Sequence, residues 1–142
     1  MKKKVLLFVL LGILTTCFFA VLILSNLQGV IANEKEQAHF DVYREKAKTY
    51  IQSDPEMINR YGNAMTVKFV GSYTYKEIGE RTFLDTLSDT FFPRVPDTIE
   101  AFTEKLEYIT FTVEINGDLY KITFEKNSDG ELAVSNLAEE KQ

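Results

Sequence analysis

The residues whose types could support chemistry are few, and the first is His39, the only histidine. A metal site needs clustered His, Cys or carboxylate side chains, and a serine-hydrolase triad needs a histidine that activates a serine. His39 precedes Phe40 near the start of a predicted helix, and no G-x-S-x-G sequence presents a serine. We therefore expect His39 at a surface or an interface, and we expect no metal site.

A second candidate is the carboxylate pair Asp85 and Asp89, which are four residues apart and so share a face if they lie on a helix. Paired carboxylates act as general acid and base when their surroundings separate their pKa values. Nothing in the flanking sequence indicates such burial, so a solvated helix face is the simpler interpretation. Glycine-rich phosphate loops are absent, because the glycines are scattered. We expect a protein that is not an enzyme and uses no cofactor.

The only cysteine, Cys17, lies in an uncharged run from Val5 to Leu24. A lipoprotein cysteine follows a small residue and precedes a polar chain, whereas Cys17 follows Thr16 and precedes Phe18. We reject lipidation and interpret Cys17 as a small apolar residue. The rest of the chain therefore has no disulfide, which favours a domain stabilised by its core, as in many bacterial surface proteins.

The run Val5–Leu24 is long enough to cross a membrane, because twenty helical residues reach about 30 Å. Three lysines precede it, and the following flank Asn33–Glu36 carries a single base. The positive-inside rule then places residues 1–4 in the cytoplasm and the chain after the span outside. The alternative is a signal peptide cleaved after Ala32, which would give a secreted protein.

This interpretation divides the chain into a transmembrane helix over residues 5–24, a juxtamembrane segment over 25–32 and one extracytoplasmic domain over 33–142. The domain holds all 21 acidic residues but only 13 of the 16 basic ones, a formal charge of −8. Such a charge argues against nucleic acid and against adsorption to anionic lipid. It permits a basic protein partner, with simple solubility as the alternative.

Helical patterns come first in the predicted domain. Between Asn33 and Ser53 the apolar residues form one stripe at helical spacing; they are Phe40, Tyr43, Ala47, Tyr50 and Ile51. Asp54 suits an N-cap and Pro55 the first position of a second, short helix, which Gly62 would end. For Ile78–Lys105 we predict two short helices around a proline loop.

Strand patterns follow the helical ones. Ala64–Lys76 alternates with period two and predicts one long strand with a bend or bulge at Gly71. Asn116-Gly117 predicts a hairpin that pairs Val113 with Tyr120. A third strand is expected over Leu132–Leu137, followed by a frayed tail. The fold class is therefore α+β in two layers, with helices on one face of an antiparallel meander.

Two apolar groups could contact a partner. Tyr73 and Tyr75 end the predicted long strand, where aromatic side chains belong either to the core or to a rim. The proline loop holds a second group, in which apolar side chains stand beside an arginine, as in interface anchors; it consists of Phe91, Phe92, Arg94 and Val95. These four side chains could equally close the open end of the sheet.

The segment Tyr50-Ile51-Gln52-Ser53-Asp54-Pro55-Glu56, followed by Tyr61-Gly62, lies after a single span and before antiparallel strands. This arrangement resembles the cytochrome oxidase assembly factor family of small single-pass proteins, in which a helix, a short segment and a β-meander recur. The resemblance covers Tyr50–Phe69 and part of Tyr108–Leu137, with Tyr61 in place of the family's leucine. It implies a non-catalytic assembly or chaperone-like role and assigns no functional residue.

The sequence thus predicts a membrane-anchored module that binds or helps to assemble a membrane or envelope protein. The alternative is an exported immunity or inhibitor protein that neutralises a toxin or hydrolase at the cell envelope. In that case the acidic surface would block a basic cleft.

Overall fold

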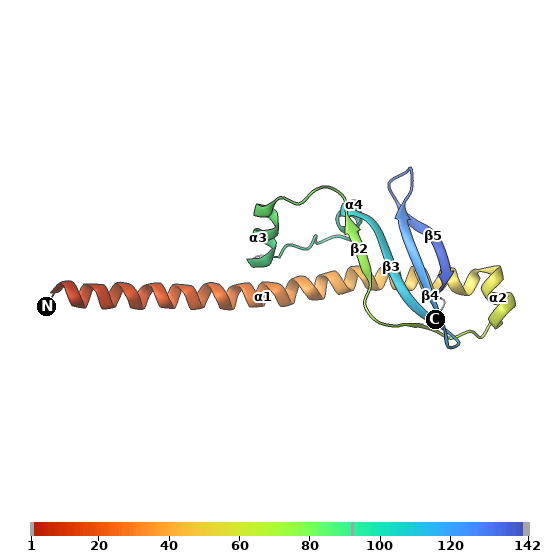
Figure 1. Cartoon of the computed structure of the whole chain (residues 1–142), viewed down its shortest axis with the longest axis horizontal. Helices are drawn as coiled ribbons and strands as arrows, with labels where there is room; N and C mark the ends of the chain where they lie inside the picture. Colours follow the sequence, from red (N-terminus) through yellow and green to blue (C-terminus); the bar gives the residue numbers. More distant parts are fainter. Residues whose placement is uncertain (1, 92, 141–142) are drawn as a thin grey trace. The chain divides into compact units, whose positions relative to one another are not determined.

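The fold was obtained as a computed structural model, which describes residues 2–91 and 93–140. It is α+β, as predicted, with a long N-terminal helix, short helices and a five-stranded antiparallel sheet (Figure 1). In chain order the elements are α1 (Lys2–Ser53), α2 (Pro55–Tyr61), β1 (Val67–Phe69), β2 (Thr74–Glu77), α3 (Phe83–Phe91), α4 (Ile99–Lys105), β3 (Leu106–Ile115), β4 (Asp118–Lys126) and β5 (Leu132–Glu139).

The chain divides into two compact units. The first comprises Met1–Lys35 and Arg81–Val95, and the second comprises Glu36–Glu80 and Pro96–Gln142. The prediction of one extracytoplasmic domain over residues 33–142 stays a prediction, and residues 81–95 group here with the N-terminal part of α1. The apolar run and the helical stripe after Asn33 belong to one helix, because α1 passes through Gly29 without a break.

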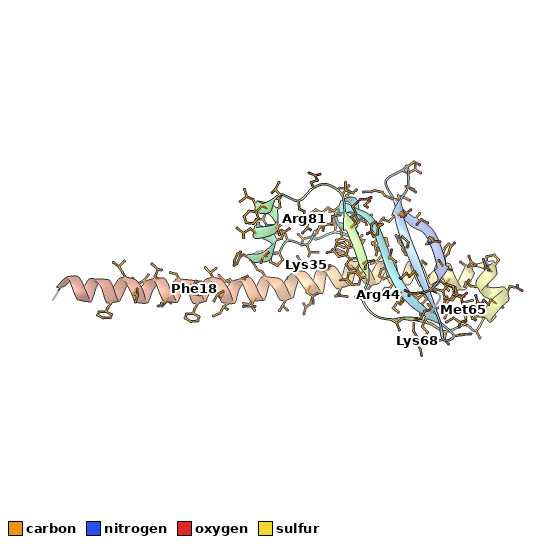
Figure 2. All side chains as sticks on the ribbon, in the orientation of Figure 1. Phe18, Lys35, Arg44, Met65, Lys68 and Arg81 are labelled. Carbon is orange, nitrogen blue, oxygen red and sulfur yellow. The ribbon has the colours of Figure 1, made fainter. Side chains whose placement is uncertain are left out.

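The first unit contains the apolar part of α1. Among the described residues, this is the one helix long and apolar enough to cross a membrane, and no residue of its most apolar stretch is buried. Figure 2 shows Phe18 projecting from the helix, and this side chain is largely exposed. Thr16 Oγ1 donates to Gly12 O at 2.8 Å, so this polar side chain is satisfied within the helix.

The second unit is built on the C-terminal part of α1. Its predicted apolar stripe is buried against the sheet at Phe40, Tyr43, Ala47 and Ile51. Tyr50 was wrongly placed in this stripe, because its side chain is 39 % exposed. The strands cross this part of the helix (Figure 1), and Phe40 and Tyr43 meet the rings of Phe111 and Phe124. Aromatic contacts therefore join the two layers.

The turn from α1 to α2 has the predicted chemistry. The Asp54 carboxylate accepts from Glu56 N at 2.9 Å and Met57 N at 3.1 Å, which satisfies two free donors at the helix start. Pro55 occupies the first helical position, and Gly62 ends α2 with φ 78°. α4 also begins with a cap, Thr98, whose side chain accepts from Ala101 N at 3.2 Å.

The hairpin of β3 and β4 has the predicted register. Val113 pairs with Tyr120, and Asn116 and Gly117 both have positive φ, as a type I′ turn requires. The apolar partners of β3 and β4 point toward α1 and are almost fully buried. They form the core together with Met57 and Phe102.

The prediction of one continuous strand over Ala64–Lys76 is wrong, because the structure has two strands there, β1 and β2. Both pair with β3, but Phe69 is opposite Val113 and Thr74 is opposite Thr110. Residues 70–73 thus face residues 111–112, so two extra residues leave the ladder there. Gly71, with φ 74°, supplies the predicted bend.

β5 forms the end of the sheet order β1-β3-β4-β5. Phe124 pairs with Val134, and Gly130 in the preceding turn has φ 82°. Thr123 pairs with Asn136, so Ser135 is an extra residue and forms a β-bulge. The strand continues to Glu139, which corrects the predicted frayed tail at residues 138–139.

Candidate functional site

His39 has a structural role. Its side chain is buried, stacks on Phe102 with ring centroids 4.7 Å apart, and lies 2.8 Å from Pro96 O. Because a carbonyl can only accept, Nε2 donates to it. The prediction of a histidine at a surface or an interface is therefore wrong as to the surface, because the side chain is buried against Phe102. No cluster of three or more possible metal ligands exists in residues 2–91 and 93–140.

Asp85 and Asp89 share α3 but have separate partners. Asp85 accepts from Thr82 N at 3.0 Å, while Asp85 N donates to Thr82 Oγ1 at 3.2 Å, which is a capping box. The hydrogen bonds from Thr82 lower the pKa of Asp85. Asp89 Oδ2 lies 3.5 Å from Arg81 Nη1. The arrangement stabilises the helix and keeps Asp85 ionised, which does not suit a general acid.

Tyr73 and Tyr75 belong to an aromatic cluster around Phe40 in the second unit. The centroid of the Phe40 ring is 3.8 Å from that of Tyr73 and 5.3 Å from that of Tyr75. Tyr73 is half-buried and accepts from Gln37 Nε2 at 3.0 Å, whereas Tyr75 is 38 % exposed. Both rings thus lie at the rim of the core, and their contact with a partner stays a prediction.

The predicted contacts in the proline loop fall in the first unit. Phe91 is the last residue of α3 and is 45 % exposed, Arg94 is exposed and Val95 is half-buried. Phe92 lies outside the described residues. The structure thus leaves Phe91 and Arg94 open to an external contact.

In the second unit, the clearest candidate for a binding surface is the free edge of β5. Natural sheets protect their edges with short strands, lysines, prolines or bulges. The opposite edge follows this rule, since β1 and β2 have three and four residues and carry Lys68 and Lys76. Leu132–Ala138 of β5 contains no charge and no proline, and its single protective feature is the bulge at Ser135.

An apolar groove of about 690 Å³ lies beside this edge, and we name it the β5 groove. One wall is a face of α1 and the other is formed by β4 and β5; the lining residues are Val42, Glu45, Lys46, Thr49, Tyr50, Ser53, Phe124 and Val134. Val42 is 42 % exposed, so an apolar helix surface remains uncovered next to the strand.

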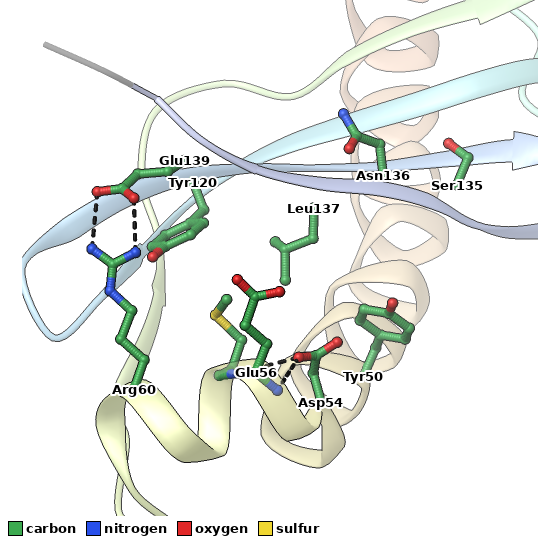
Figure 3. A pocket seen from close by; sticks show the side chains of 10 residues that line it. Tyr50, Asp54, Glu56, Arg60, Tyr120, Ser135, Asn136, Leu137 and Glu139 are labelled. Carbon is green, nitrogen blue, oxygen red and sulfur yellow. Dashed lines mark hydrogen bonds and ion pairs between the residues drawn. The ribbon is translucent and has the colours of Figure 1, made fainter.

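A smaller, polar cavity of about 290 Å³ continues along β5 and shares Tyr50 with the groove (Figure 3). It lies between α2 and the C-terminal half of β5. Arg60 makes two bonds to Glu139 across it, Nη1–Oε2 at 2.7 Å and Nη2–Oε1 at 3.1 Å. The bond to Glu139 raises the pKa of Arg60. This pair fixes the end of β5 to α2 and leaves neither partner as a free charge.

Carboxylates without an ion pair line both the groove and the cavity. The carboxylates of Glu45 and Glu56 form no ion pair within the described part of the chain. Lys46 also forms none there; its Nζ lies 5.0 Å from the centroid of the Tyr43 ring and adds a positive charge beside Glu45. A ligand that followed β5 would therefore contact apolar side chains in the groove and would gain from a basic group near Glu45 or Glu56.

Sequence reasoning missed this surface. The uncharged stretch Leu132–Ala138 was a readable signal, since an unprotected edge strand is unusual. The groove could not be predicted from the sequence of β5 alone, because it depends on which face of α1 extends past the edge of the sheet.

Comparison with protein-family models, curated proteins and solved structures finds no match to this chain. The resemblance to cytochrome oxidase assembly factors therefore stays a prediction.

Proposed function

We propose that this chain is a non-enzymatic, membrane-anchored module that binds a membrane or envelope protein outside the cytoplasm. The apolar part of α1 is the anchor, with residues 1–4 in the cytoplasm. The observation that carries the proposal is the unprotected edge of β5 beside the β5 groove. A sheet edge of this kind accepts an extended segment as an additional strand, through main-chain hydrogen bonds.

The ligand in this proposal is an extended segment of a partner protein that carries alternating apolar side chains and a basic residue. The alternation follows from strand geometry, since every second side chain would point into the β5 groove. The basic residue would pair with Glu45 or Glu56. A second copy of the chain fits less well, because two domains of formal charge −8 repel each other.

Site-specific crosslinking in the native membrane tests this function. A photoreactive residue is placed at Val42 in the groove, and the matched control carries it at Ile78, which is also exposed but lies outside the groove. We expect a reproducible protein adduct from position 42 alone, joined to an apolar segment with a Lys or Arg. Equal adducts from both positions, or none, would contradict the proposal.

The identity of the adduct separates the proposed function from its alternative. A toxin or hydrolase from outside the cell would favour the immunity or inhibitor function, which the acidic surface also suits. A resident membrane or envelope protein would favour the binding or assembly module.

A further inference from the structure

α3 presents an apolar face that the described chain leaves largely exposed. Its four large apolar side chains are 77 %, 73 %, 45 % and 45 % exposed at Phe83, Leu84, Leu87 and Phe91. At 3.6 residues per turn they lie within an arc of about 100°. Asp85 and Asp89 lie on the other side of the helix, so α3 is strongly amphipathic.

The same helix is fixed to α1 at the end of the predicted span. Ser25 Oγ donates to Phe91 O at 2.7 Å, within the first unit. This bond satisfies a carbonyl at the C-terminus of α3, which has no partner inside the helix. Ser25 directly follows Leu24, the last residue of the predicted span. The end of α3 is therefore held at the level where the hydrocarbon would meet the headgroups.

We propose that α3 lies in the outer headgroup–acyl boundary of the phospholipid bilayer, with Phe83, Leu84, Leu87 and Phe91 inserted among the acyl chains. This inference rests on the membrane anchoring in the proposed function. Soluble surfaces rarely expose four large apolar side chains on one short helix, whereas an interfacial helix requires such a face. Ser25 holds α3 at the end of the predicted span, a depth at which the covering material is lipid rather than protein.

Arg94 agrees with this placement. It follows α3 by three residues, is exposed, and forms no ion pair within residues 2–91 and 93–140. A guanidinium at this level can bind the phosphate of a headgroup through two hydrogen bonds. Every phospholipid carries that phosphate, so the insertion of α3 does not require an anionic lipid. Phe91 and Arg94, which the sequence assigned to a partner contact, are lipid contacts in this inference.

Depth-dependent fluorescence quenching in reconstituted vesicles tests the inference. The full-length chain carries an environment-sensitive fluorophore on a single cysteine, and the quencher is a lipid brominated on its acyl chains. The test variant is Leu87→Cys and the matched control is Thr86→Cys on the polar side, both with Cys17→Ser. Vesicles of phosphatidylcholine, with and without phosphatidylglycerol, are compared.

We expect quenching several-fold stronger at position 87 than at position 86, and the same in both lipid compositions. Equal quenching at the two positions would overturn the insertion, and dependence on phosphatidylglycerol would overturn the apolar mechanism. The native Cys17, labelled in otherwise unchanged protein, reports the anchor separately. Strong quenching there with none at position 87 refutes the inference about α3 alone, whereas no quenching at Cys17 refutes the anchor.

Discussion

Val134 of β5 lies directly opposite Phe124 of β4, and these two residues line the sheet side of the β5 groove. Phe124 is 2 % exposed and contacts the ring of Tyr43, with centroids 5.6 Å apart. The floor of the groove is therefore part of the core and is fixed before any ligand arrives. A preformed apolar floor beside an open strand edge lowers the entropic cost of binding an extended segment.

A charge placed in the groove should weaken partner binding. Val42→Glu puts a carboxylate on an exposed apolar position of the groove wall, where a bound segment would bury it. We expect at least about a tenfold loss of affinity in capture from solubilised membranes, equivalent to about 1.4 kcal/mol. The control Ile78→Glu should bind within a factor of about two, well inside that scale. Equal losses in both variants would remove the groove from the binding site.

Charge reversal at the unpaired acids should also weaken binding. Glu45→Lys combined with Glu56→Lys would repel the basic residue of the ligand, and the loss should shrink as salt is added. Glu104→Lys combined with Glu131→Lys changes the net charge equally at exposed positions outside the groove. We expect little effect from this control. If both double variants lost affinity alike, overall charge rather than the groove would be responsible.

Phe40 should be a principal contributor to the stability of the second unit. Its side chain is fully buried between α1 and the sheet, so Phe40→Ala should lower the free energy of unfolding by about 3–5 kcal/mol. Tyr50→Ala, at a position 39 % exposed on the same helix, should cost less than about 1 kcal/mol. Denaturant unfolding of the full chain in detergent measures both values. A similar cost at the two positions would contradict the assignment of the core face.

Stability should fall at alkaline pH partly because of Tyr75. Burial, with the nearby charge of Glu36, raises the pKa of Tyr75 to about 12 from its ordinary value of 10.0. Below pH 10 the phenol is neutral in both the folded and the unfolded chain. Between pH 10 and 12 only the unfolded chain ionises there, so ionisation favours unfolding. Tyr75→Phe should make the decline shallower over this range, measured by unfolding curves, and an unchanged slope would refute the assignment.

Local signals predicted much of the fold. The register of β3 with β4 followed from Asn116-Gly117 and the alternation around it, and the start of α2 followed from Asp54 and Pro55. These features are determined by residues that are close together in the chain, so local sequence patterns predict them. The break between β1 and β2 did not follow in this way, because it depends on how residues 70–73 match residues 111–112 of a distant strand.

The candidate site was less predictable for the same reason. The position of the free edge and the exposure of Val42 both result from the packing of α1 on the sheet. This packing links residues that are far apart in the chain. Tyr73 and Tyr75 are candidate partner contacts by sequence because aromatic side chains suit interfaces. In the structure both rings pack around Phe40. An aromatic type alone does not separate a rim from a binding surface.

Hydrogen exchange of the full chain, alone and with the partner captured through position 42, tests the addition of a strand to β5 most directly. The amides of Leu132–Glu139 that point away from β4 have no main-chain partner in the free sheet. We predict that the partner slows exchange in this segment and leaves β1 and β2 unchanged. Protection confined to β1 and β2, with β5 exchanging as before, would contradict the account.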